Sequence, residues 1–185
     1  MTTPRVLEVH PVRHWLAQVR QAGFPLDHPY LEQCWTPVLG PTSVLLLRRC
    51  NALWADATPA RLPVAQLSGQ LGLGRGTAPS SHIWRTVRRL VDNGFAREPA
   101  TGELHVYTEV PPVPARLLAR TPAWCRQAHD RLLGAHLDAL ARSSAPKQTV
   151  LSAGAPPAAG GGPQRMAALL EVRRDSNPTP RRISR

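Results

Sequence analysis

Apolar residues recur at helical spacing in the segment Ser81 to Arg97, which reads SHIWRTVRRLVDNGFAR. The apolar positions follow the pattern i, i+4, i+7 and i+8, which places them on one stripe of an α-helix: Ile83, Val87, Leu90 and Val91. A serine pair precedes this stripe and is expected to cap the helix, and Gly94 is expected to end it in a left-handed conformation. The pattern predicts an amphipathic helix over about 81–93.

The same periodicity predicts four further helices. Residues 11–22 carry apolar side chains at helical spacing before Gly23, which is expected to end a short helix there. Two helices are predicted over 43–56 and 63–71, and a fourth over 122–142. The intervening stretch FPLDHPYLEQCWTPVLGP contains four prolines, so we expect an extended segment with at most one helical turn.

Strict alternation replaces the helical period after Gly94. Leu104, Val106, Thr108 and Val110 alternate with polar or aromatic residues, which is typical of a half-buried strand. Together with the residues that follow Gly94, this pattern predicts a two-stranded hairpin joined through 99–102.

Three helices followed by a hairpin resemble the winged helix-turn-helix superfamily of bacterial regulators. In VAQLSGQLGL, Ser68 stands where that family has a small residue and Gly72 stands in the turn, and WRTVRRLVDNGFARE is similar to its recognition helix and wing. The resemblance covers about residues 41–110. It implies a mainly α fold with a small β-hairpin: a winged helix-turn-helix domain with flanking helices and a disordered C-terminal tail.

The resemblance and the composition together predict four parts of the chain. They are a helical or extended N-terminal extension (1–40), a winged helix-turn-helix domain (41–112), a C-terminal helical segment (113–142) and a flexible basic tail rich in Pro, Gly and Ala (143–185).

Positive charge is concentrated away from the N-terminus. The formal net charge is +11, and arginine supplies nearly all of it because Lys147 is the only lysine. Basic and acidic residues number three and three in 1–40, eight and five in 41–110, five and two in 111–142, and seven and two in 143–185. This distribution favours a polyanionic partner, and nucleic acid rather than a membrane.

If the resemblance holds, residues 81–93 form a recognition helix and 95–110 a wing, and double-stranded DNA is the partner. Ser81 and His82 lie at the end expected to enter the major groove, where Arg85 and Arg89 are able to bind guanine edges. The residues expected near phosphates or on the wing are Arg75, Thr77, Arg88, Arg97 and His105. The stretch 72–80 is longer than a turn of about 3–4 residues, so either the recognition helix starts later or Arg75 and Thr77 belong to a loop that itself touches phosphate, and we favour the loop.

Each of these assignments has a simpler alternative. The arginines of 81–93 are equally compatible with an ordinary solvated face, and the hairpin with a structural sheet edge. The 122–142 helix is expected either to pair two chains in a homodimer or to pack back on the N-terminal helix. The tail is either a nonspecific tether to phosphate or without consequence.

Catalytic and metal-binding chemistry is not indicated by any motif. Cys34, Cys50 and Cys125 are too widely spaced for a zinc knuckle and are expected to be reduced, and Cys125 with two histidines of the same helix lacks a fourth ligand. The sequence also has no phosphate-binding loop and no nucleophile motif. We therefore expect no enzyme, no cofactor and no metal.

The function expected from the sequence is sequence-specific DNA binding by a transcriptional regulator. No apolar run is long enough to cross a bilayer, and the N-terminus lacks a signal region, so a cytoplasmic, nucleoid-associated protein without membrane contact is expected. The alternatives are a winged-helix module for protein–protein interaction, or a plasmid or phage replication or partition protein that binds repeated DNA sites.

Overall fold

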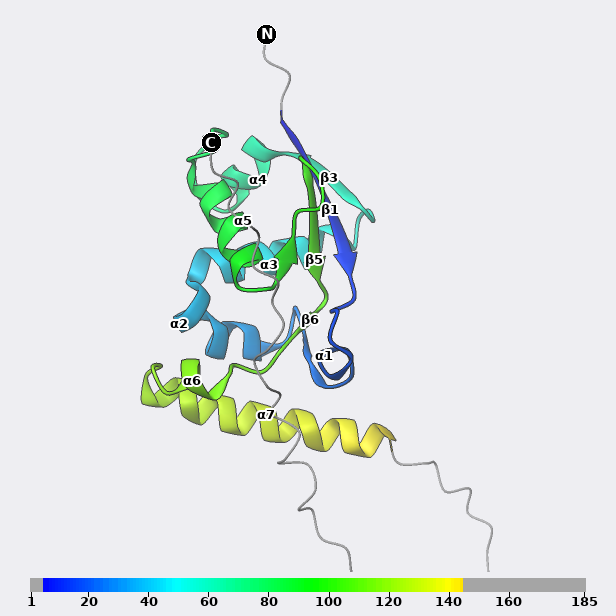
Figure 1. Cartoon of the computed structure of the whole chain (residues 1–185), viewed down its shortest axis with the longest axis vertical. Helices are drawn as coiled ribbons and strands as arrows, with labels where there is room; N and C mark the ends of the chain where they lie inside the picture. The colour runs from blue at the N-terminus through cyan, green and yellow to red at the C-terminus, as the bar shows by residue number, and fades with distance from the viewer. Residues whose placement is uncertain (1–4, 145–185) are drawn as a thin grey trace, which may run out of the picture. The chain divides into compact units, whose positions relative to one another are not determined.

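A four-stranded mixed sheet organises the computed structural model, which describes residues 5–144 (Figure 1). Its strands lie in the order β3 (Ala60–Pro63), β1 (Val6–Val12), β5 (Glu103–Tyr107) and β4 (Ala96–Arg97). Strand β1 runs antiparallel to β3 and parallel to β5, while β4 and β5 are antiparallel. Three helices lie on one side of the sheet: α3 (Pro41–Leu53), α4 (Val64–Gln70) and α5 (His82–Asp92).

Side chains alternate across the two central strands. In β1 and β5 the apolar residues are buried towards the helices: Leu7, Val9, Leu104 and Val106. The residues between them, Glu8 and His10 in β1 and Glu103 and His105 in β5, point to the opposite face because successive side chains of a strand alternate. The sheet therefore has one apolar and one polar face.

A second group of elements surrounds a short antiparallel pair, β2 (Phe24–Pro25) with β6 (Glu109–Val110). The group also contains helices α1, α2, α6 and α7 and a π-helical turn, η1. Their bounds are Ala17–Ala22 for α1, Leu31–Trp35 for η1, Thr36–Leu39 for α2, Ala115–Leu118 for α6 and Ala123–Ser144 for α7.

Tyr30 connects three segments of this second group. Its ring is fully buried and stacks on Phe24 with centroids 3.9 Å apart. The Val113 N–H donates to the Tyr30 hydroxyl oxygen at 2.9 Å, so the hydroxyl proton is available for His129 Nδ1, 2.5 Å away. Burial lowers the pKa of His129, which favours the neutral imidazole that accepts this bond. Tyr30 thereby joins the Val113 segment and helix α7 to the core.

The sheet corrects the fold class expected from the sequence. Strands β4 and β5 do pair as a hairpin, but they form one edge of a four-stranded mixed sheet that also contains β1 and β3. A mainly α winged helix-turn-helix fold with a small β-hairpin is therefore wrong. The physical reason is the parallel pairing of β1 with β5, which joins segments about 95 positions apart in the sequence, so that no local periodicity predicts the pairing.

The N-terminal elements also differ from the expectation. The helix predicted over 11–22 is reduced to α1, Ala17–Ala22, because Pro11 and Val12 complete strand β1. The stretch expected to be extended contains η1 and α2 in direct succession. The helices predicted over 43–56, 63–71 and 122–142 are confirmed as α3, α4 and α7 with shifted ends, whereas the flexible tail predicted for 143–185 lies almost entirely outside the described residues.

We expect Tyr30→Phe to destabilise the protein by about 1–3 kcal/mol. The substitution keeps the buried ring but removes the partner of the Val113 N–H and of His129. Urea unfolding followed by circular dichroism measures the effect. Tyr107→Phe is the matched control, because the Tyr107 hydroxyl makes no hydrogen bond within residues 5–144; equal losses in the two variants would contradict the role given to Tyr30.

The environment of Glu109 predicts that the stability of the folded protein depends on pH. Burial alone raises the pKa of Glu109, but bonds from the His14 N–H, the Thr108 hydroxyl and Arg13 outweigh burial and lower it below the ordinary value of 4.5. Because its pKa is lower in the folded state, ionised Glu109 stabilises the fold fully at pH values above its pKa in the unfolded chain. This stabilisation is lost as the pH falls through its pKa in the folded protein.

The variant Glu109→Gln is therefore expected to be less stable than wild type by about 1–3 kcal/mol at pH 7, and the difference is expected to shrink below pH 4.5. Denaturant unfolding at a series of pH values measures it. Glu98→Gln, at an exposed position, serves as control. A difference that stays constant down to pH 3 would show that the ionised carboxylate is not the stabilising species.

Candidate nucleic-acid interface

Helix α5 buries one face and exposes the other, as its sequence predicts. Its buried residues are Ile83, Trp84, Thr86, Val87 and Leu90. Gly94 follows the helix with φ +75°, and the Phe95 N–H donates back to the Leu90 carbonyl at 2.9 Å. This bond and the positive φ are those of a helix ended by glycine, so both the apolar stripe and the predicted end of the helix are confirmed.

The start of α5 differs from the expectation of a side-chain cap. Ser81 is the N-cap residue, but its hydroxyl makes no capping bond and is buried without a partner among the described residues. The first turn contains no acidic residue. Because the first N–H groups of a helix lack intrahelical acceptors and carry partial positive charge, this end of α5 favours an anion.

The exposed face of α5 carries unpaired cationic side chains. His82, Arg85 and Arg88 are all exposed. Within residues 5–144 no carboxylate lies within ion-pair distance of Arg85 or Arg88. Asp92 is exposed at the C-terminal end of the helix, so the positive charge is greatest over the N-terminal two turns.

Arg89 has a structural contact that the sequence does not indicate. One guanidinium nitrogen donates to the Leu39 carbonyl at 3.1 Å, at the end of α2. The same nitrogen approaches Gly40, whose φ of +83° turns the chain from α2 into α3. The side chain expected to bind a guanine edge thus spans from α5 to the α2–α3 junction.

The loop between α4 and α5 is held against α5. The Trp84 Nε1–H donates to the Thr77 carbonyl at 3.2 Å, and Thr77 itself is half-buried. Arg75 is exposed, and Gly72 and Gly74 take positive φ values of +69° and +76° on its N-terminal side. The structure therefore brings Arg75 and Thr77 close to the N-terminal half of α5, where the sequence places them.

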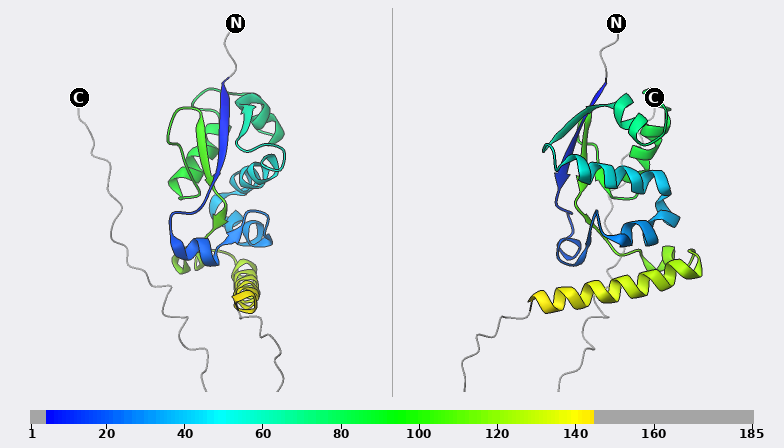
Figure 2. Two further views of the ribbon diagram at one scale, coloured as in Figure 1. Left: turned by 90° about the vertical axis from the view of Figure 1, so that its right-hand side faces the viewer. Right: turned by 180° about the vertical axis from the view of Figure 1, so that it is seen from behind.

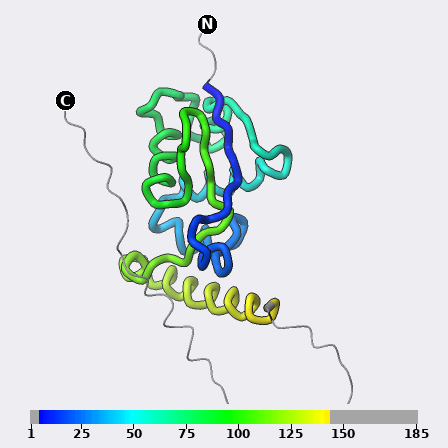
Figure 3. Tube along the Cα trace, turned by 45° about the vertical axis from the view of Figure 1, so that its right-hand side comes forward, coloured from blue at the N-terminus to red at the C-terminus, as the bar shows by residue number. Residues whose placement is uncertain are grey.

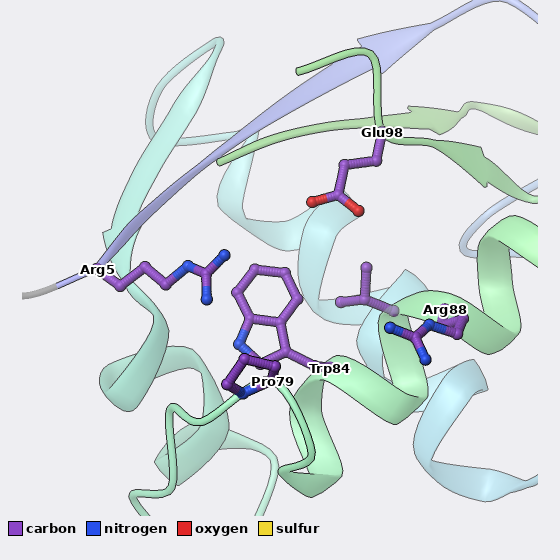
Figure 4. A pocket seen from close by; sticks show the side chains of 6 residues that line it. Arg5, Pro79, Trp84, Arg88 and Glu98 are labelled. Carbon is purple, nitrogen blue, oxygen red and sulfur yellow. The ribbon is translucent and has the colours of Figure 1, made fainter. Parts of the chain in front are cut away.

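A shallow pocket beside α5 brings in a residue that sequence reasoning missed. Figure 4 shows the guanidinium of Arg5 over the Trp84 indole, with Arg88 on the other side of the ring and Glu98 above it. The Arg5 guanidinium carbon lies 4.6 Å from the ring centroid, a cation–π contact. The alternation of VLEVH was the available signal for a strand that places Arg5 here. Glu98 reduces the positive charge of the pocket.

Arg97 and His105 do not join this surface. They face each other across β4 and β5, and their neighbours Ala96 and Val106 are buried towards the helices. Arg97 and His105 consequently lie on the polar face of the sheet. Burial lowers the pKa of His105, and the positive potential of His10 and Arg97 lowers it further.

Helix α7 packs back on its own chain, although not on the residues expected. Cys125, Ala128 and His129 are buried, and the Cys125 thiol lies 3.7 Å from the Cys34 carbonyl of η1. Trp15, expected to cover this helix, is 67 % exposed. Residues 131–143 are half-buried or exposed, so pairing of two chains through 122–142 stays a prediction and would use the C-terminal part of the helix.

Comparison with protein-family models, with curated proteins and with solved structures gives no match to this chain. The similarity of residues 41–110 to winged helix-turn-helix regulators therefore stays a hypothesis. Over residues 5–144, no helix is both long and apolar enough to span a bilayer.

The contact of Arg89 with the Leu39 carbonyl predicts that Arg89 contributes more to the free energy of unfolding than Arg85 does. Arg89→Ala is expected to lower the free energy of unfolding by about 0.5–1.5 kcal/mol, because a bond to the Leu39 carbonyl is lost. Arg85→Ala is expected to change it by less than about 0.5 kcal/mol. Urea unfolding of both variants measures this, and a larger loss for Arg85→Ala would refute the structural role of Arg89.

Proposed function

We propose that this chain binds double-stranded DNA through the N-terminal half of α5 and the loop before it. The observation that carries the proposal is the group of exposed arginines around an uncapped helix start: Arg75, Arg85 and Arg88. These residues come from two adjacent segments, and Arg85 and Arg88 have no carboxylate partner within residues 5–144. A guanidinium group without a carboxylate partner binds phosphate with no ion pair of its own to break first.

The two parts of this surface are suited to different contacts. An α-helix fits the major groove, and a guanidinium there donates two bonds to a guanine edge; Arg85 and His82 are placed for that role. Arg75 and Arg88 flank the helix and suit phosphate contacts, which fix position without reading sequence. The free N–H groups at the start of α5 favour a phosphate in the same place.

Arg89, Arg97 and His105 are not part of this proposal. Arg89 is occupied by the Leu39 carbonyl, and the other two lie on the polar face of the sheet. This reduces the DNA-binding set to Ser81, His82, Arg85, Arg88, Arg75 and Thr77.

We further propose that DNA binding serves transcriptional regulation, in the cytoplasm and in association with the nucleoid, and that the chain is not an enzyme. A replication or partition protein that binds repeated DNA sites would use the same surface. Repeated copies of one motif in the bound DNA favour that alternative.

A second candidate is an interaction module for another protein. Trp15 is 67 % and Trp124 55 % exposed, and large aromatic side chains are enriched at protein interfaces. Neither tryptophan lies on α5. The two candidates therefore use different residues and are separable by mutation.

Selection of bound sequences from random duplex DNA at two salt concentrations tests the proposal. Wild type is expected to enrich a defined motif, and Arg85→Ala/Arg88→Ala to lose it. Arg85→Ala alone is expected to relax preference at one base pair by about 1–3 kcal/mol, whereas Arg88→Ala weakens binding to all sequences and lowers the salt slope by about one.

The matched control is Arg116→Ala/Arg142→Ala, which removes the same charge from exposed positions of α6 and α7. It is expected to keep the motif. Salt-sensitive binding without any motif, retained by the α5 variant, would contradict the proposal, leave these arginines as solvated charge and favour the interaction module.

A further inference from the structure

The polar face of the sheet carries two histidines and two glutamates in register. Figure 2, left, shows β1 and β5 in front of the helices, and Figure 3 shows the two strands side by side. Their parallel pairing places Glu8 beside Glu103 and His10 beside His105. Because residues two apart in a strand share a face, all four side chains lie on the side of the sheet away from α3, α4 and α5.

The side chains of three of these residues lie close enough to share one ion. Ligand atoms of His10, Glu103 and His105 all lie within 4.8 Å of one another, and the two imidazole centroids are also 4.8 Å apart. Of the groups of His, Cys, Asp and Glu in residues 5–144, this is the one with such spacing. Tetrahedral zinc ligands lie about 2.0–2.2 Å from the ion, so modest side-chain rotations close the cluster.

Two imidazole nitrogens in the cluster are shielded and unsatisfied. His10 Nε2 and His105 Nδ1 are inaccessible to solvent and have no hydrogen-bond partner among the described residues. His10 Nε2 lies 3.2 Å from a Glu8 carboxylate oxygen, which is within ion-pair distance but lacks the geometry of a hydrogen bond. A buried polar atom without a partner is destabilising, and an ion bound between the rings would give these nitrogens a partner.

The surrounding charges are compatible with a cation. Glu8 accepts a bond from the Arg61 Nε at 2.8 Å, which fixes its carboxylate next to His10. Glu103 is 45 % exposed and 3.9 Å from His105 Nε2, so its carboxylate is free to rotate inwards. Arg97, opposite His105 on β4, is exposed, so its guanidinium is free to turn into solvent.

We propose that His10, His105 and Glu103 form a binding site for a divalent transition-metal ion. Two imidazoles and a carboxylate suit Zn²⁺ best, and also Co²⁺ and Ni²⁺. The ion would join β1 to β5 and so fasten the N-terminal strand to the sheet. The site goes beyond DNA binding, does not rest on it, and is an alternative to the expectation of no metal.

Titration of the untagged full chain with Co²⁺ under reducing conditions tests the site. One equivalent is expected to bind with a visible ligand-field absorption, and Zn²⁺ is expected to displace it. His10→Gln/His105→Gln is expected to abolish this absorption. The control His82→Gln alters an exposed histidine of α5 and is expected to bind as wild type does.

Two further measurements keep the test decisive if the double variant folds poorly. Glu103→Gln changes the most exposed ligand and is expected to weaken Co²⁺ binding by more than about tenfold, with the metal-free unfolding temperature unchanged. Zn²⁺ is expected to raise the unfolding temperature of wild type more than that of Glu103→Gln, because an ion that binds the folded state stabilises it.

Three outcomes would overturn the proposal. One is the absence of Co²⁺ binding at micromolar concentrations in wild type. Another is equal affinity in wild type, Glu103→Gln and the double histidine variant. The third is a strong thiolate-to-cobalt band in the near ultraviolet, which would place the ion on Cys34, Cys50 or Cys125 instead.

Discussion

The parallel pairing of β1 with β5 is the constraint on which both proposed surfaces depend. Strand β1 lies between β3 and β5, so without it these two strands have no common neighbour. The pairing places Arg5 over Trp84 at the side of α5, and it places Glu8 and His10 beside Glu103 and His105. One strand from the start of the chain therefore contributes to the helical side and to the polar face at once.

The second group of elements depends on buried polar contacts rather than on a sheet. Tyr30 and Glu109 each accept bonds from segments far away in the sequence, Val113 in one case and Arg13 and His14 in the other. The Trp35 indole N–H adds a bond to the Pro111 carbonyl at 2.9 Å. Burial makes each of these groups costly if left unpaired, so they select one arrangement of η1, β6 and α7 where apolar packing alone is less specific.

Local signals in the sequence predict α5 well, whereas for β1 they offer the alternation of VLEVH, which does not identify the partner strand. Helix α5 is encoded by its own apolar stripe and by Gly94, both of which act within one segment. The helix predicted over 11–22 came from apolar spacing that continues past the end of β1, and a strand paired with residues about 95 positions later has no local period to reveal it. Arg75 and Arg85 are exposed on segments that local patterns predict, whereas the contact of Arg89 with Leu39 depends on tertiary packing.

The arginines of α5 and the proposed metal ligands lie on opposite sides of the sheet. On its polar face Arg61 pairs with Glu8, whereas Arg97, opposite His105 on β4, has no carboxylate partner within residues 5–144. On the helical side Arg85 and Arg88 have no such partner within residues 5–144. A polyanion is therefore attracted to α5, whereas the ligands proposed for a divalent cation lie on the opposite face, where Arg61 is paired with Glu8. Because the two ligands prefer opposite faces of one sheet, binding of either does not require displacement of the other.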